Sequence, residues 1–152
     1  MDLSKLKLKV HQKCSNLALK KIEVIKSELE SLQEASNAEI KSSVGDKYET
    51  GHSMIMLEKE KLIVQLRDAY KLKKALDLID LGKSVKKVSL GTLVKESNNF
   101  YYFSANFGVI KIANIKVFAL STLSPLGQVM LNKTPGNSYT FRGTQFLIEE
   151  VL

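Results

Sequence analysis

The sequence predicts an α+β protein in which an N-terminal antiparallel coiled-coil hairpin precedes a small antiparallel sheet with one short helix. Two observations predict the hairpin: apolar residues recur at helical spacing over residues 3–40 and again over residues 53–80. One observation predicts the sheet. After Gly82 the pattern changes to short β-branched and aromatic segments separated by turn residues. The change divides the chain into a hairpin domain, residues 1–80, and a β-rich domain, residues 81–152.

The first helical segment carries one apolar stripe whose members follow one another at steps of three or four residues. Its members are Leu3, Leu6, Val10, Cys14, Ala18, Ile22, Ile25, Leu29 and Leu32. This spacing is typical of the seam of a coiled coil, with Lys and Glu on the outer faces. Neither Pro nor Gly interrupts residues 3–40. We therefore expect one continuous helix with a length on the order of 50 Å.

The second helical segment carries a matching stripe. Its apolar members are Ile55, Leu62, Leu66, Ala69, Leu76 and Ile79, and Lys59 and Lys73 fill two seam positions. A helix of this length cannot bury its stripe alone, so antiparallel pairing with the first helix is the simplest solution. Pairing between two chains is the alternative. Gly45 and Gly51 favour the hairpin, because glycine relaxes the chain where it reverses, and they place the tip at about residues 42–52.

The β-rich half contains several short segments with strand-like composition. Strands are predicted over residues 85–94, 100–105, 109–112, 115–120, 138–141 and 144–151. Between them, Ser124 as N-cap and Pro125 at the first helical position predict a short helix that continues to Leu131. In the aromatic run 100–103, alternation places two rings in the core and two outward.

Composition limits the classes of protein that this chain can form. Its 152 residues carry a net charge of +7, of which residues 81–152 contribute +5. A basic half suggests an acidic partner, either nucleic acid or an acidic protein face, and a solvated basic surface is the alternative. The single cysteine, Cys14, excludes an internal disulfide and fits the reducing cytoplasm. We expect a soluble cytoplasmic monomer without a membrane partner, because no apolar run reaches about 18 residues.

Asp46 and Glu49 are the candidate site residues at the predicted tip. They are three residues apart, so a helical turn would point both carboxylates the same way. Two carboxylates can supply part of the oxygen shell of Mg²⁺, and a partner would have to supply the rest. An ordinary acidic pair on a solvated helix is the alternative.

The cysteine and the two histidines form no recognisable catalytic or metal-binding set. The spacing of His11, Cys14 and His52 matches no zinc pattern. Cys14 is expected to be a buried inert thiol on a helical face, and both histidines are expected at the surface. We therefore expect that the chain is not an enzyme by itself and binds no cofactor alone.

Three stretches resemble the bacterial Gre family of transcription elongation (transcript cleavage) factors. Residues 45–49 read Gly-Asp-Lys-Tyr-Glu and match the family's Gly-Asp-x-x-Glu. Residues 78–80 and 88–94 are similar to the family's hinge and first C-terminal strand. Residues 124–137 begin Ser-Pro-Leu-Gly and resemble the family's Ser-Pro, short helix and turn. The resemblance spans nearly the full length and makes this chain similar to a divergent member.

The resemblance implies a fold and a mechanism. It implies that the C-terminal domain is FKBP-like and docks on RNA polymerase, with Ser124, Pro125, Leu126 and Gly127 binding the partner. The hairpin would enter the secondary channel, and nucleic acid would be met only within that complex. Asp46 and Glu49 would act as catalytic and metal-holding residues there, sharing Mg²⁺ with the polymerase so that its own active site cuts backtracked RNA.

The sequence also departs from the family pattern at the tip. Lys47 and Tyr48 lie between the two acids, and Lys47 is expected to weaken their hold on a cation. Two functional hypotheses therefore stay open. The chain either stimulates transcript cleavage, or it is a non-catalytic regulator of the secondary channel or a coiled-coil adaptor for another partner.

Overall fold

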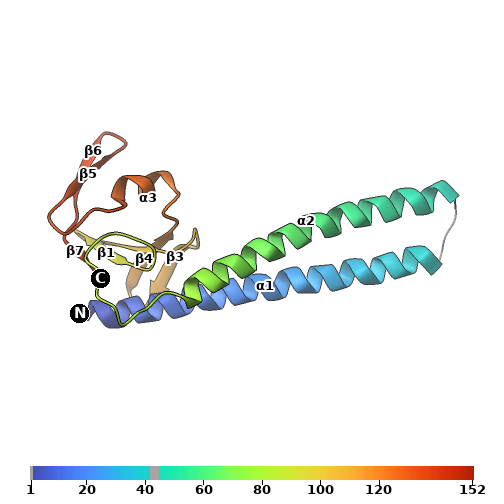
Figure 1. Cartoon of the computed structure of the whole chain (residues 1–152), viewed down its shortest axis with the longest axis horizontal. Coiled ribbons are helices and arrows are strands. Elements are labelled where there is room, and N and C mark those ends of the chain that lie inside the picture. Colours follow the sequence, from blue (N-terminus) through green and yellow to red (C-terminus); the bar gives the residue numbers. More distant parts are fainter. Residues whose placement is uncertain (1, 42–44) are drawn as a thin grey trace. The chain divides into compact units, whose positions relative to one another are not determined.

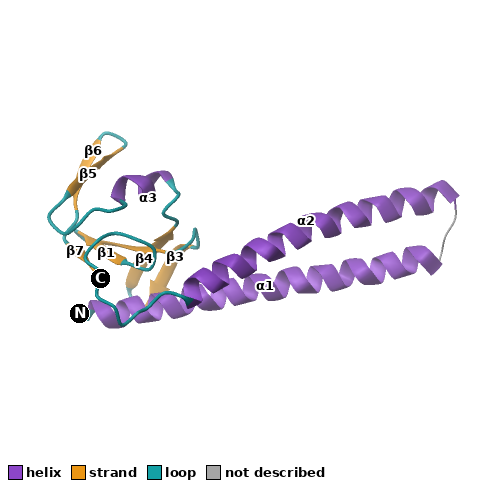
Figure 2. Ribbon diagram, in the orientation of Figure 1, coloured by secondary structure: helices purple, strands orange, loops and turns teal. Residues whose placement is uncertain are grey.

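The computed structural model describes residues 2–41 and 45–152, with the side chains of residues 45–48 left out. The helices are α1 (Leu3–Lys41), α2 (Gly45–Asp77) and α3 (Pro125–Met130). The strands are β1 (Leu93–Glu96), β2 (Asn99–Phe103), β3 (Gly108–Ile112), β4 (Ile115–Leu120), β5 (Ser138–Phe141), β6 (Thr144–Leu147) and β7 (Glu150–Val151). This order confirms the predicted α+β class (Figure 2). None of the described helices is long and apolar enough to cross a membrane.

Residues 18–74 form a compact unit of their own, which we call the hairpin unit. Within it the two long helices run side by side in opposite directions (Figure 1). Four buried side chains from both helices form the seam, namely Ile22, Ile25, Leu62 and Ala69. Lys59 lies at the edge of the seam and donates a hydrogen bond of 2.7 Å to Gln33 Oε1. The predicted pairing of the two stripes within one chain is therefore confirmed for residues 18–74, whereas the stripe residues before Leu17 pack elsewhere.

Helix α2 begins eight residues earlier than the apolar pattern indicates, at Gly45 instead of Ser53. Gly51 lies inside the helix, where a Cβ atom would come within 3.0 Å of the Glu39 carboxylate on α1. A glycine costs a helix about 1 kcal/mol relative to alanine, which is small beside the pairing of two long helices. Of the tip predicted at residues 42–52, residues 42–44 lie outside the described residues, and the rest belongs to α2.

The main sheet has five strands in the order β3-β4-β2-β1-β7. Strands β2 and β4 are parallel, with Phe100 opposite Val117, while the other pairs of this sheet are antiparallel. The expectation of an antiparallel sheet is therefore wrong at this pairing. Strand β3 lies at the outer edge of the sheet, and the chain then reverses into β4, which lies between β3 and β2. Strand β4 therefore runs in the same direction as β2. Strands β5 and β6 form a separate antiparallel pair.

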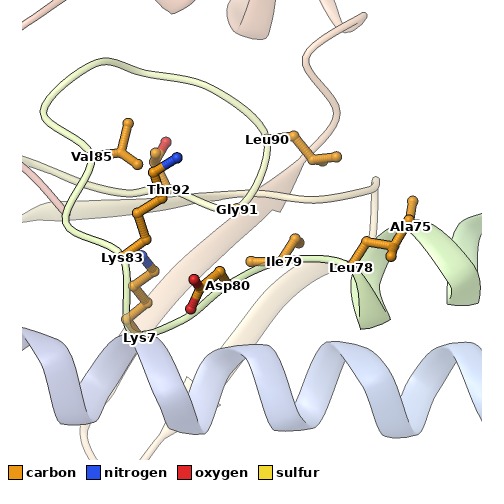
Figure 3. Close-up of a pocket in the computed structure, with 10 residues that line it drawn as sticks. All are labelled: Lys7, Ala75, Leu78, Ile79, Asp80, Lys83, Val85, Leu90, Gly91 and Thr92. Atoms are coloured by element: carbon orange, nitrogen blue, oxygen red, sulfur yellow. The ribbon is translucent and has the colours of Figure 1, made fainter.

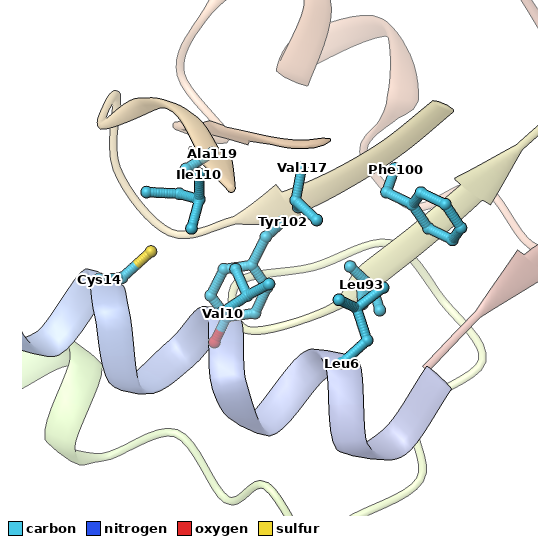
Figure 4. Packing of buried hydrophobic residues seen from close by; sticks show 9 residues of the cluster. All are labelled: Leu6, Val10, Cys14, Leu93, Phe100, Tyr102, Ile110, Val117 and Ala119. Carbon is cyan, nitrogen blue, oxygen red and sulfur yellow. The ribbon is translucent and has the colours of Figure 1, made fainter. Parts of the chain in front are cut away.

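The first turns of α1 cover one face of the main sheet. Leu6, Val10 and Cys14 point from the helix toward the strands (Figure 4). They pack in one cluster with six buried side chains of the sheet, namely Leu93, Phe100, Tyr102, Ile110, Val117 and Ala119. As a result, residues 1–17 and 75–152 form one compact unit, which we call the sheet unit. Packing thus divides the chain at different places from the change of sequence pattern near residue 81.

A second cluster covers the opposite face of the sheet. It joins residues of the strands to α3 and to the β5–β6 pair, and its members are Val88, Val94, Phe103, Leu120, Met130, Tyr139, Ile148 and Val151. The alternation of the aromatic run is present, since Tyr102 and Phe103 belong to different clusters. The expectation that two rings point outward is wrong, because both faces are covered and Phe103 is fully buried.

Two predicted strands are shorter than expected because turns interrupt them. Residues 85–92 form no strand. Gly91 has a φ of +88°, and its amide donates to the Phe103 carbonyl oxygen, so that pairing begins only at Leu93. The predicted strand 144–151 divides into β6 and β7, because the Ile148 amide donates to Asn137 and the Glu149 amide donates to Lys95. The chain thereby passes from the small pair to the main sheet.

Candidate functional sites

The two acids of the predicted tip lie in the first turns of α2. Helix α2 begins at Gly45, so Asp46 and Glu49 occupy the second and fifth positions. Residues three apart in a helix lie on the same side, which is the arrangement that a shared cation requires. The Glu49 side chain is exposed, and the side chain of Asp46 lies outside the described part of the structure. The pairing of the two carboxylates therefore stays a prediction.

The donor set at this end of the hairpin unit suits a hard cation only in part. Carboxylate oxygens are the ligands that Mg²⁺ prefers, but an octahedral ion needs six. Among the side chains that the structure describes, no group of three or more His, Cys, Asp or Glu residues is placed to hold a metal. Asp46 and Glu49 could thus contribute two ligands to an ion whose remaining ligands come from elsewhere.

The predicted partner-binding segment forms the start of α3. Ser124 is the N-cap of α3: its hydroxyl accepts a hydrogen bond of 3.0 Å from the Gly127 amide and donates one of 2.7 Å to the Ser121 carbonyl oxygen. The predicted cap and the proline at the first turn are confirmed. Gly127 is buried, and a Cβ atom there would lie 2.2 Å from the Ser121 oxygen. These two residues therefore have structural roles, whereas Pro125 is exposed and Leu126 is half-buried.

An apolar groove of about 460 Å³ lies beside this segment. Its lining includes Pro125, Leu126 and the exposed side chains of Val109 and Phe118. Arg142 lies at the same groove, with its guanidinium carbon 5.1 Å from the centre of the Phe141 ring. An exposed apolar surface with a cation at its edge is typical of a protein-binding site.

His11 is buried, which contradicts the expectation that both histidines lie at the surface. Its Nδ1 lies 2.7 Å from the Tyr102 hydroxyl, and the two rings meet edge to face. The sequence carries a signal for this burial: Lys7 and His11 are four residues apart and each directly follows a member of the apolar stripe, Leu6 and Val10. His52, in contrast, is half-buried on α2.

Cys14 is fully buried, as the sequence indicates. It accepts a hydrogen bond of 3.8 Å at Sγ from the Ser104 hydroxyl. Burial raises the pKa of the Cys14 thiol, and the hydrogen bond from Ser104 opposes that rise in part. A neutral thiol in the core is a poor nucleophile, so its role is packing.

Glu96 and Tyr139 form a buried polar pair that the sequence did not reveal. Glu96 lies at the end of β1, and its carboxylate accepts a hydrogen bond from the Tyr139 hydroxyl on β5. Burial raises the pKa of Glu96, and the hydrogen bond from Tyr139 opposes the rise in part. The pair connects the main sheet to the β5–β6 pair inside the second cluster, and we interpret it as structural.

Comparison with known proteins gives structural matches only. No known family model and no curated protein matches the chain. The crystal structure of GreA factor homolog 1 (Gfh1) of Thermus thermophilus is 15% identical with a TM-score of 0.34, and the match covers 91% of this chain and 94% of that one. A structure of the transcription factor Gfh1 is 13% identical with a TM-score of 0.32, and the match covers 90% of each chain. Because the identities and TM-scores are low, the fold class is assigned from the helices, strands and strand pairings of this chain alone.

Proposed function

We propose that this protein is a Gre-like transcription elongation factor that binds RNA polymerase through its secondary channel and stimulates cleavage of backtracked RNA. The observation that carries the proposal is the position of Asp46 and Glu49. Both belong to the first turns of α2, where the chain has just reversed from α1. A two-helix hairpin with acids at its reversal is suited to deliver carboxylates into a narrow cavity of another molecule.

The roles of the two acids follow from their chemistry. A divalent cation shared with the polymerase would stabilise the attacking and leaving oxygens of phosphodiester hydrolysis. Asp46 and Glu49 would hold it from one side, and the polymerase would provide the other ligands. By this proposal the chain has no hydrolytic activity alone, because it contributes only part of the site.

The groove beside α3 is the proposed docking surface for the polymerase. Pro125 and Leu126 offer apolar contacts, and Arg142 offers a cation that favours an acidic or carbonyl-rich partner surface. The positive charge of residues 81–152 supports the same partner chemistry. The internal hydrogen bonds of Ser124 fix the loop that presents Pro125 and Leu126.

The second candidate function is occupation of the channel without cleavage. The observation that favours it is Lys47, which lies between the two acids in the sequence. A lysine ammonium close to two carboxylates competes with a metal ion for their charge. If the Lys47 ammonium keeps the metal ion from binding the two carboxylates, the hairpin blocks access to the polymerase active site without supporting cleavage and inhibits the polymerase.

The test uses purified bacterial RNA polymerase stalled in a backtracked complex with a labelled transcript and Mg²⁺. The proposal expects that the wild-type chain accelerates cleavage and that the Asp46→Ala/Glu49→Ala variant binds equally well but loses the acceleration. Lys47→Ala is the matched variant of the same turn and is expected to cleave faster than wild type.

Binding is measured in parallel by competition with labelled wild-type chain. Binding without cleavage by both the wild type and Lys47→Ala would favour the inhibitory candidate over the first. Failure to bind the polymerase at all would refute both candidates and leave an adaptor for another partner. Equal acceleration by the double variant would refute the role of the two acids.

A further inference from the structure

A cavity of about 420 Å³ lies within the sheet unit, between the start of α1 and the segment that leads from α2 into β1. Figure 3 shows Lys7 extending from α1 toward this segment, with Asp80 and Lys83 beside it. Its volume is within the range of cavities that hold small organic molecules. The proposed polymerase function uses none of its residues.

Lys7 is the unusual group in this cavity. Only 5% of the residue is exposed, and its side chain lines the cavity. Burial lowers the pKa of Lys7, and the negative charge of Asp80 raises it in part. Because the side chain lines the cavity, a ligand anion bound there would be an acceptor for its ammonium, where water solvates the charge less than in bulk solvent.

Asp80 compensates this charge incompletely. Its Oδ1 already accepts a hydrogen bond of 3.0 Å from the Gly82 amide, which fixes the turn that follows α2. Lys83 adds a second cation to the lining, so two lysines face one carboxylate. The cavity therefore has a net charge of about +1, which matches one negative charge on a ligand.

The rest of the lining is aliphatic. Ile79, Val85 and the rim residues Leu78 and Leu90 form the walls, and Leu78 is 76% exposed. None of the ten lining residues is aromatic, so the cavity offers no surface for stacking a nucleotide base. A ligand that buries itself here needs an aliphatic body as well as an anionic end.

A second, smaller cavity of about 100 Å³ shares part of the lining of the first. Lys7 and Lys83 line both cavities, and Ser4 and Ser84 add hydroxyl groups to the smaller one. Ammonium groups with hydroxyl groups in the adjoining lining are donors suited to the two oxygens of a carboxylate.

We propose that this cavity binds a small amphipathic monoanion, an aliphatic chain with one terminal carboxylate. The carboxylate accepts hydrogen bonds from Lys7 and Lys83, and the chain packs against Ile79, Leu78 and Leu90. Because Asp80 repels the ligand, it limits the affinity and disfavours ligands with two or more negative charges.

Octanoate is the probe, titrated into the full-length protein while methyl NMR signals of Ile79, Leu78 and Leu90 are followed. We expect saturable shifts of these methyl groups. Lys7→Met keeps the aliphatic stem and should weaken binding about tenfold or more, the loss expected for one charge-assisted hydrogen bond. Lys9→Met, at an exposed position of the same helix, is the matched control and should bind like wild type.

Asp80→Asn keeps an oxygen for the Gly82 amide and removes the repelling charge, so it should bind octanoate more tightly than wild type. A purely structural role of Lys7 and Asp80 would not produce opposite changes in affinity. The proposal is overturned if octanoate causes no saturable shift, if Lys7→Met binds as tightly as wild type, or if octanol binds as tightly as octanoate.

Discussion

Substitution of Gly127 by alanine tests the packing beneath the start of α3. A Cβ atom at this position would lie 2.2 Å from the Ser121 carbonyl oxygen, 2.9 Å from Ser124 Oγ and 3.1 Å from Thr122 Cα. Cβ contacts in proteins essentially never fall below 3.0 Å, so the turn before α3 must open by about 0.8 Å, the difference between 3.0 and 2.2 Å. The atom that must move is backbone, which no change of rotamer can relieve.

Three contributions determine the size of the effect. Overpacking that shifts the backbone costs about 1–3 kcal/mol. Displacement of Ser124 weakens the cap of α3, which is worth about 1 kcal/mol. The better helix propensity of alanine raises the free energy of unfolding by about 1 kcal/mol and offsets part of this loss. We therefore expect the free energy of unfolding to fall by about 1–3 kcal/mol, and the unfolding temperature by roughly 2–12 °C.

The assay is thermal and urea unfolding, with Gly82→Ala as the matched control. A Cβ atom at Gly82 would lie 3.4 Å from Asp80 Oδ1, an ordinary contact, so this variant should unfold like wild type or slightly later. Equal unfolding midpoints for the two variants would refute the close approach at Gly127. The comparison also separates the structural role of Gly127 from the partner contact that the Gre resemblance assigns to it.

Two further predictions concern the sheet unit. Leu6→Ala should lower the free energy of unfolding, measured by urea titration, by about 2–5 kcal/mol because Leu6 packs against the sheet. Leu8→Ala, at an exposed position of the same helix, should change it by about 0.5 kcal/mol or less. Equal losses for the two variants would contradict the packing of α1 on the sheet. Because the pKa of Glu96 is raised, the folded state binds more protons than the unfolded state between the ordinary carboxyl pKa and the raised one, so wild-type stability falls as pH rises through this window. Glu96→Gln should flatten this pH dependence. The same dependence of stability on pH in both proteins, measured by urea titrations across a pH series, would contradict this account.

Local patterns predicted those elements whose residues decide their own conformation. The seam of α1 is periodic without Pro or Gly, so one helix was the only consistent interpretation, and it spans Leu3–Lys41. Ser124 and Pro125 define a helix start by their own chemistry, and the cap forms as expected. Asp46 and Glu49 were found as a pair for the same reason, since their spacing is a property of the chain.

Predictions failed where a distant segment decides the outcome. Residues 85–92 alternate like a strand, but Gly91 turns with a positive φ and packs against Ile79, where a Cβ atom would lie 2.7 Å away. His11 reads as a polar surface residue until Tyr102, ninety-one positions later, provides a partner for its ring. Gly45 and Gly51 indicate a break, but α2 begins at Gly45 and continues through Gly51, where the helix lies close to Glu39 of α1.

The sequence by itself determined the two helical stripes, the short capped helix and the spacing of the acidic pair, because periodicity and capping act within a few residues. Only the tertiary structure decided that the first turns of α1 belong to the core of the sheet, that β2 and β4 are parallel, and that Lys7 is buried beside Asp80. The physical reason is that burial and charge compensation depend on which surfaces meet, and residues far apart in the chain supply those surfaces.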